Sequence, residues 1–180
     1  MQQSHDVSST MRILSIEEAQ NLYGTTELGA FFSNVDWQYP AVVPSYFLPK
    51  DSGAKVAVAR ALTSVFLERG PSVLWITNTK VWPSSGHMDL ANRYRQSYGE
   101  TRSVEQAPVH SFENNDRAAF VSMLCLGLFF VWDVEIMSLD RSTAVTLSHD
   151  EWLEYRFSRG SEHIVPIFEE RLSPLLETRM

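Results

Sequence analysis

The chain has 180 residues, of which 44% are hydrophobic, so it can bury one core and we expect a single domain over residues 1–180. Its formal net charge of -7 argues against nucleic-acid binding, because that affinity depends on Lys and Arg side chains that neutralise phosphates. Cys125 is the only cysteine, which excludes an intramolecular disulfide and a cysteine-rich zinc site. These features favour a reducing compartment, and we expect the protein to be cytoplasmic.

Residues 1–12 are predicted to form a flexible tail, since this segment is polar and lacks the charged and apolar regions of a secretory signal. The longest apolar segment, from Ala118 to Trp132, is shorter than the ~20 residues that a helix needs to cross a bilayer. We therefore expect no membrane partner.

The first half of the chain predicts helices around a pair of strands. Ser15 and Glu18 have the spacing of a capping box, so a helix is expected to start there, and Gly24 and Gly29 should divide the region into two short helical pieces. A strand within 41–48, a helix over 54–69 and a strand over 72–77 follow. The second strand is apolar on both faces, which favours a layered sheet with a right-handed crossover if the two strands are parallel.

The second half predicts a long apolar helix followed by a hairpin. The run over 115–130 is apolar almost all round, which is typical of a central helix between two layers. Strands over 132–138 and 143–148 favour an antiparallel pair. The other expected elements are a helix over 84–98, an irregular link over 100–111, a short helix over 150–157 and an amphipathic segment over 165–177.

Together these elements predict an α/β fold, with an α+β fold as the alternative. We expect a mixed sheet of about four strands that contains a βαβ unit, a central apolar helix and a C-terminal β-hairpin, with helices packed around it. The pattern shows no internal repeat and no linker between domains.

The densest set of chemically capable residues is Ser148, His149, Asp150 and Glu151. A histidine with two carboxylates suits acid–base catalysis or metal binding. Ser148 and Glu151 also have capping-box spacing, and acidic residues favour a first helical turn, so the pattern favours a helix start. Capping does not explain His149, which is therefore the candidate catalytic residue.

Asp133 and Glu135 alternate with apolar residues on a predicted strand, so both carboxylates are expected on one face of the sheet. Together with His149 and Asp150 near the end of the adjacent strand, they could meet a basic protein partner or hold a divalent cation. No metal-ligand spacing such as HExxH or an EF-hand loop is present, so we predict a solvated sheet face and no metal or other cofactor.

A candidate small-ligand pocket lies between the first predicted strand and helix. The segment over 50–55 is not a P-loop, because the GxxxxGK[ST] pattern is absent. If the flanking strands are parallel neighbours, a crevice is expected beyond their ends. Its lining would comprise Lys50, Thr77, Asn78, Thr79, Lys80 and Trp82.

Cys125 could serve as a nucleophile if a histidine lay beside it as a base. Its neighbours in the sequence are apolar, which favours an inert buried thiol with a raised pKa. No GxSxG or SxxK motif offers a serine nucleophile instead.

Five short motifs stand out along the chain: Trp82-Pro83-Ser84-Ser85, Tyr94-Arg95-Gln96-Ser97-Tyr98-Gly99, Glu105-Gln106-Ala107-Pro108 followed by His110, Trp132-Asp133, and Ser148-His149-Asp150-Glu151. Together they resemble a group of uncharacterised bacterial proteins, over about residues 40 to 157. The resemblance implies a single α/β domain of bacterial origin and carries no activity with it.

Our functional hypothesis is a non-enzymatic interaction module with a protein partner, comparable to an immunity protein, that binds through Asp133, Glu135, His149 and Asp150. The alternative is an enzyme, either metal-assisted through His149 with Asp133 and Glu135 or built on the crevice pocket. The two hypotheses differ in whether these side chains converge in one concave site. The sequence does not fix the oligomeric state.

Overall fold

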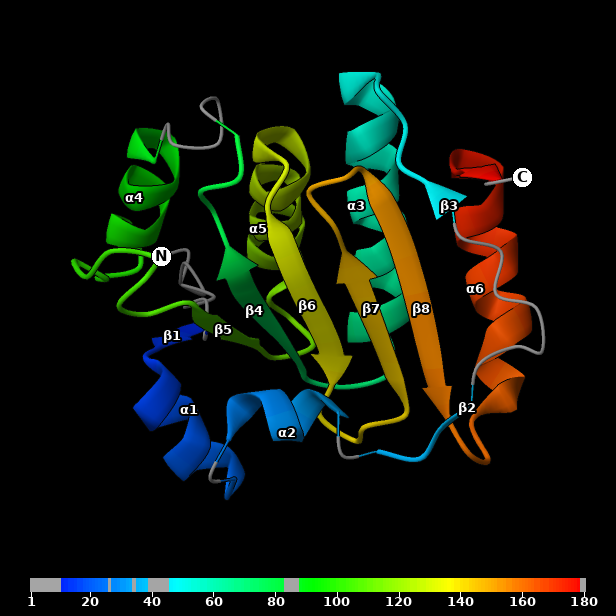
Figure 1. The fold of residues 1–180 in the computed structure, drawn as a ribbon, viewed down its shortest axis with the longest axis horizontal. Coiled ribbons are helices and arrows are strands. Elements are labelled where there is room, and N and C mark those ends of the chain that lie inside the picture. The colour runs from blue at the N-terminus through cyan, green and yellow to red at the C-terminus, as the bar shows by residue number, and fades with distance from the viewer. Residues whose placement is uncertain (1–10, 26, 34, 39–45, 83–87, 179–180) are drawn as a thin grey trace, which may run out of the picture.

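The computed structural model describes residues 11–25, 27–33, 35–38, 46–82 and 88–178. Its centre is one antiparallel sheet (Figure 1). Along the sheet the strands lie in the order β1 (Arg12–Leu14), β5 (Val109–Phe112), β4 (Ser72–Asn78), β6 (Asp133–Ser138), β7 (Thr143–Leu147), β8 (Trp152–Ser158), β3 (Tyr46–Phe47) and β9 (Glu177–Thr178), and β2 (Trp37–Gln38) also pairs with β8.

Helices lie on both faces of this sheet. One face packs against α3 (Ser52–Leu67), α5 (Arg117–Phe130) and α6 (Val165–Leu172), which lie behind or beside the sheet in Figure 1, while α4 (Asp89–Gln96) lies next to α5. Two short helices, α1 (Ile16–Tyr23) and α2 (Leu28–Ser33), cover part of the other face. Short 3₁₀ turns at Glu162–Ile164 and Ser173–Leu175 flank α6.

The two faces bury separate hydrophobic clusters. The larger cluster joins α3, α5 and α6 to alternate residues of the central strands, for example Leu74, Ile136 and Tyr155. The smaller cluster joins Phe31 and Phe32 of α2 to the opposite face of the same strands. Alternation along each strand therefore sends apolar side chains to both sides, and the sheet is buried on both faces over much of its area.

Several predicted elements are confirmed. The capping box at α1 is present, with Glu18 N donating to Ser15 Oγ at 3.1 Å and Ser15 N donating to Glu18 Oε2 at 2.6 Å. Gly24 ends α1 with a φ of 64°, whereas Gly29 lies inside α2 and breaks nothing. Helix α3, strand β4, helix α5 and the antiparallel pair β6–β7 are found where the pattern placed them, as is the amphipathic α6.

The predicted βαβ unit is wrong. β3 and β4 are joined through α3, but β6, β7 and β8 lie between them in the sheet, and all strand pairs among the described residues are antiparallel. The sheet is also larger than the four strands expected, because the described residues form nine, of which β1, β2, β3 and β9 are only two or three residues long. The mixed α/β composition remains correct.

The segment after β7 is a strand and not the predicted helix. Leu153, Tyr155 and Phe157 are buried in β8 while the residues between them are partly exposed, which is the period of a half-buried strand. The predicted irregular link over 100–111 likewise ends in β5. Residues 1–10 of the predicted tail and residues 83–87 at the expected start of α4 lie outside the described residues, while Arg12 already belongs to β1.

Helix α5 is not enclosed between two layers as predicted. It lies in the same layer as α3, and its outer side leaves Phe129 43% exposed. Within the described part of the chain, no helix is long and apolar enough to cross a membrane.

Candidate interaction site

The residues Ser148 to Glu151 form the tight turn between β7 and β8. Ser148 O accepts a hydrogen bond from Glu151 N at 3.0 Å, and Ser148 N donates to Trp152 O at 2.9 Å. Ser148 Oγ accepts from Asp150 N at 3.2 Å, which is the local bonding that serines provide in turns. The spacing that resembles a helix cap therefore serves a strand-to-strand reversal, and the predicted helix start is wrong.

Asp133 and His149 meet across this end of the sheet. β6 and β7 pair with Val134 opposite Leu147, so the residue that starts β6 lies beside the turn that follows β7. Asp133 Oδ1 accepts from His149 N at 2.8 Å, and His149 Nδ1 lies 2.8 and 2.9 Å from the two carboxylate oxygens. His149 Nε2 is 3.5 Å from Asp150 Oδ1. The imidazole is held in one orientation at the protein surface.

A buried lysine supports the turn from below. Lys55 Nζ donates to Leu128 O at 3.0 Å and to Glu151 Oε1 at 3.1 Å, and the lysine side chain is only 8% exposed. Leu128 is among the last residues of α5, whose carbonyls lack helical partners and favour a nearby cation. Lys55 thus caps α5 and fixes Glu151 with the same ammonium group.

Sequence reasoning missed Lys55, although a signal was present. Lys55 lies three and four residues before Val58 and Ala59, both of which are fully buried. A lysine on the apolar stripe of a helix needs a partner in the interior, because an unpaired buried charge is costly.

The turn borders a hollow of about 360 Å³, which we call the turn hollow. Trp82 is 50% exposed at its rim, and its indole Nε1 donates to His149 O at 3.4 Å. The lining residues are Trp82, Val131, His149, Asp150 and Glu151. A second hollow of about 330 Å³ adjoins it and shares Asp150 and Glu151; its other lining residues are Phe47, Leu48, Lys50 and Glu177.

Backbone strain is concentrated around the turn hollow. Val131 and Glu151 have φ values of 55° and 59°, in the left-handed region that favours glycine. Val131 is the C-cap of α5, a position with left-handed backbone that a β-branched residue rarely occupies. Two of the five residues that line the hollow therefore adopt costly backbone conformations, which is a pattern typical of functional surfaces.

Glu135 does not join this site. Its carboxylate accepts from Thr146 Oγ1 at 3.0 Å and from Arg156 at 2.6 Å, on the sheet face that points away from α3 and α5. Burial raises the pKa of Glu135, and the neighbouring Arg156 and Thr146 act in the opposite direction. The structure thus brings Asp133, His149 and Asp150 together and leaves Glu135 in a separate ion pair.

The residues of the predicted crevice are divided among three hollows. Lys50 lines the hollow beside Glu177, and Trp82 lines the turn hollow. Asn78 and Lys80 line a third hollow, together with Thr77 and Thr79. This division follows from the sheet topology, because β3 and β4 are not neighbours.

The remaining candidates form no reactive constellation. Cys125 is partly buried beside Leu126 and Phe129 in an apolar groove, and burial raises the pKa of its thiol. His110 is fully buried on β5, where desolvation lowers its pKa to about 3. Within the described residues, no group of three or more His, Cys, Asp or Glu side chains could hold a metal ion.

Comparisons of the chain with protein-family models, with curated proteins and with solved structures found no match.

Proposed function

We propose that this protein is a non-enzymatic interaction module that binds the basic surface of a partner protein through the turn hollow and the hollow beside it. The observation that carries the proposal is Trp82, which is half exposed and held against the turn by its bond to His149 O, next to the Asp150 carboxylate. Such a module would neutralise or accompany its partner, as immunity proteins do.

The charges of this surface favour a basic partner. Asp150 has a side chain 63% exposed, and Glu177 is exposed on the neighbouring strand. Among the described residues that line this pair of hollows, Lys50 is the exposed cation, whereas the nearby Lys55 is buried and already bonded. Carboxylates therefore outnumber available cations here, and charge complementarity of this kind selects partners and orients them.

Aromatic side chains give this surface its binding capacity. Trp82 and Phe47 are 50% and 39% exposed, and they lie at the two hollows that share Asp150 and Glu151. Tryptophan is enriched among the few interface residues that contribute most of the binding free energy, because it buries a large area with little loss of conformational freedom. An aromatic anchor beside carboxylates suits an interface with a basic partner.

The hydrogen bonds within the turn leave the Asp150 carboxylate available to a partner. Asp133 uses both oxygens on His149, and Glu151 uses Oε1 on Lys55. The Asp150 side chain has one contact among the described residues, the long one to His149 Nε2. A partner would therefore meet a surface whose inner groups are satisfied and whose outer carboxylate is largely open.

Quantitative affinity capture from native lysate tests the proposal. Wild-type protein is compared with Trp82→Ala and Asp150→Lys, and Glu170→Lys on the exposed side of α6 is the matched charge control. We expect a stoichiometric partner with a basic surface whose affinity falls about tenfold or more in both site variants and is retained in the control. The affinity of wild type should also fall as salt concentration rises.

Recovery of no stoichiometric partner contradicts the proposal. Equal recovery by Asp150→Lys and wild type contradicts the assignment of the surface. Both site variants alter exposed side chains, so their thermal unfolding should match that of wild type.

An enzyme remains the second candidate because Asp133 orients His149 through Nδ1, the arrangement that general bases use. Asp133 and His149 would supply this chemistry without Glu135, which is bound to Arg156. His149→Gln separates the two candidates. Retained partner binding with no measurable turnover in wild type favours the interaction module, and loss of a turnover that wild type shows favours the enzyme.

A further inference from the structure

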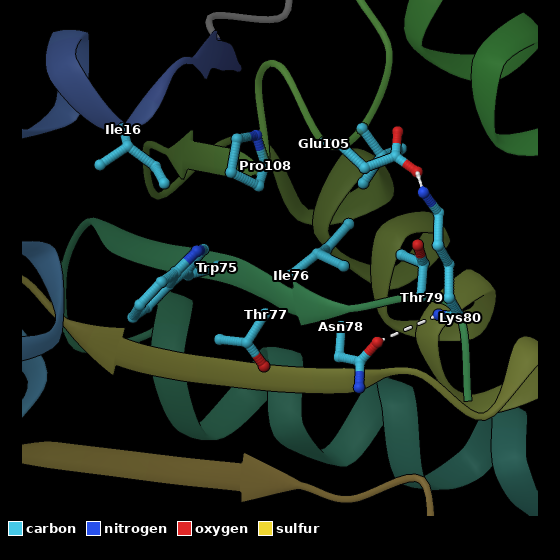
Figure 2. A pocket seen from close by; sticks show the side chains of 10 residues that line it. Ile16, Trp75, Ile76, Thr77, Asn78, Thr79, Lys80, Glu105 and Pro108 are labelled. Atoms are coloured by element: carbon cyan, nitrogen blue, oxygen red, sulfur yellow. Dashed lines mark hydrogen bonds and ion pairs between the residues drawn. The ribbon is translucent and has the colours of Figure 1, made fainter.

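A third hollow, of about 230 Å³, lies where β4 separates from the chain segment that leads into β5. The ladder between these strands ends at Trp75 opposite Val109, after which Ile76 N donates to Pro108 O at 3.0 Å. Figure 2 shows the side chains on both sides of this opening. We call it the β4 pocket; its lining residues are Ile16, Trp75, Ile76, Thr77, Asn78, Thr79, Lys80, Val104, Glu105 and Pro108.

One wall of the β4 pocket holds the hydroxyl group of Thr79. Thr79 is only 6% exposed, and within the described part of the chain its Oγ1 makes no hydrogen bond. In Figure 2 this oxygen points up toward Lys80 and Glu105. A hydroxyl both donates and accepts hydrogen bonds, so this oxygen can bind a polar ligand atom that enters the pocket.

The mouth of the pocket carries one positive and one negative charge. Lys80 Nζ lies 3.3 Å from Glu105 Oε1, and Figure 2 shows the two side chains reaching toward each other beside Thr79. Lys80 is 77% and Glu105 45% exposed, and such exposed pairs contribute little to stability. A ligand that carries both charges can therefore replace this pair at low cost.

Neighbouring bonds hold these two charged residues in place. Asn78 Oδ1 accepts from Lys80 N at 3.1 Å, which fixes the chain at the end of β4. A hydrogen bond with its own backbone lowers the pKa of Glu105, so the carboxylate is ionised at neutral pH. Both charges are therefore present when a ligand arrives.

Apart from Thr77, the rest of the pocket is apolar. Trp75, Ile76, Val104 and Pro108 form its walls, and Ile16 is 43% exposed at the side away from Lys80. Its volume of about 230 Å³ is below the ~300–1,000 Å³ of most ligand sites. The pocket therefore fits a small molecule with one charged end and one apolar end.

We propose that the β4 pocket binds a free α-amino acid with a branched or aromatic side chain. The ligand carboxylate lies between Lys80 Nζ and Thr79 Oγ1, and the ammonium group binds Glu105. The apolar side chain packs against Trp75 and Ile16. This site is independent of the turn hollow, and its occupation does not depend on the proposed partner protein.

Other small ligands fit this site less well. A phosphate would lie beside the Glu105 carboxylate with a single lysine to balance its charge. A purely apolar molecule would leave Thr79 without a partner, which costs binding free energy. A simple amine or a simple carboxylate would leave one member of the Lys80–Glu105 pair unpaired.

Calorimetric titration of the full chain with L-leucine and L-phenylalanine tests the proposal. We expect saturable binding with a dissociation constant on the order of 1 mM or below. Isoamylamine lacks the carboxylate of leucine and isocaproate lacks its ammonium, so both should bind at least about tenfold more weakly. L-glutamate should also bind more weakly, because its side chain would meet the apolar wall.

Two variants locate the site. Thr79→Val keeps the shape of the side chain and should weaken leucine binding about fivefold, whereas Lys80→Met should weaken it about tenfold. Lys50→Met changes a lysine at another hollow and should leave the affinity unchanged. Overlapping thermal unfolding curves would show that these variants are folded.

Three results would each overturn the proposal. They are the absence of saturable binding of leucine and phenylalanine to wild type, equal affinity in Thr79→Val and Lys80→Met, and equal affinity for leucine and its two truncated analogues.

Discussion

Two carboxylates on β6 are separated by one residue and have opposite surroundings. Glu135 lies over the middle of the sheet, where Arg156 and Thr146 occupy its oxygens. Asp133 lies at the strand end, where it orients His149 beside Asp150, whose side chain is largely exposed. Both side chains end in a carboxylate, but that of Glu135 supports the fold and that of Asp133 shapes the surface. Position along the strand separates the two roles, and the predictions below test that separation.

The largest expected loss of stability follows removal of Arg156. Arg156→Met leaves the buried Glu135 without its cation, and we expect the free energy of unfolding to fall by about 4 kcal/mol. The pKa of Glu135 is already raised by burial and should rise further, so folding then favours the protonated carboxyl and stability falls as pH rises through that pKa. Urea unfolding at several pH values measures both effects.

The double variant Arg156→Met with Glu135→Leu is the control for this prediction. It should recover most of the lost stability and lose the added pH dependence, because no buried charge remains. A double variant as unstable as the single one would contradict a charge-based explanation.

The second prediction concerns His110 in the interior. Burial lowers its pKa from 6.5 to about 3, with Arg95 acting in the same direction, so the folded protein holds the ring neutral. Protons bind the unfolded chain more strongly, and stability should therefore be lost as pH falls from 6.5 toward 3. His110→Gln should flatten this part of the pH–stability curve, and the same change at the exposed His163 should not.

Lys55 connects the interior to the turn, and its removal should have an intermediate effect. Lys55→Met leaves the Leu128 carbonyl and Glu151 without their donor, which should cost about 2 kcal/mol. Hydrogen exchange should become faster at the turn amides, while the amides in the middle of β6 keep their protection. Equally faster hydrogen exchange at the turn amides and in the middle of β6 would show that the turn does not open independently of the sheet.

Relief of backbone strain at the turn hollow should give a smaller change of opposite sign. Val131→Gly removes the β-branched side chain from a left-handed C-cap and should raise the free energy of unfolding by about 1 kcal/mol. Thermal unfolding measures this gain. A loss of stability would mean that contacts of the Val131 side chain outweigh its strain.

The smallest expected change in stability is that of Asp150→Asn. Its side chain is 63% exposed with only a long contact to His149, so the unfolding free energy should change by less than about 0.5 kcal/mol. The affinity for a basic partner should nevertheless fall, because the open carboxylate is lost. A large change in stability would place Asp150 with Glu135 among the residues that support the fold.

The sequence predicts those elements whose signals are local. The run 115–130 gives α5, and the strands on either side of 139–142 give the β6–β7 pair. The strand β8 has an equally clear alternation of Leu153, Tyr155 and Phe157, but the turn before it has the spacing of a helix cap and so favours a helix. A turn and a helix start use the same side chains, so spacing alone did not separate them.

The long-range order of the strands was not predictable from local patterns. A crossover through α3 is compatible with adjacent parallel strands or with strands far apart in the sheet, and only packing decides between them. For this reason the local pattern predicts Lys50 and Asn78 in one crevice, whereas the structure has them in different hollows. Asp133 and His149 were predicted near one another because a hairpin fixes which ends of its strands meet.

The burial of Lys55 under the turn also affects how fast a partner can bind. An ammonium that is bonded at once to α5 and to the turn cannot follow a movement of either without losing a buried contact. The turn is therefore already in one conformation before an encounter, so little conformational entropy is lost on binding and no slow rearrangement precedes it. Association at this surface should be limited by diffusion and by attraction between opposite charges, with rate constants that decrease as salt is added.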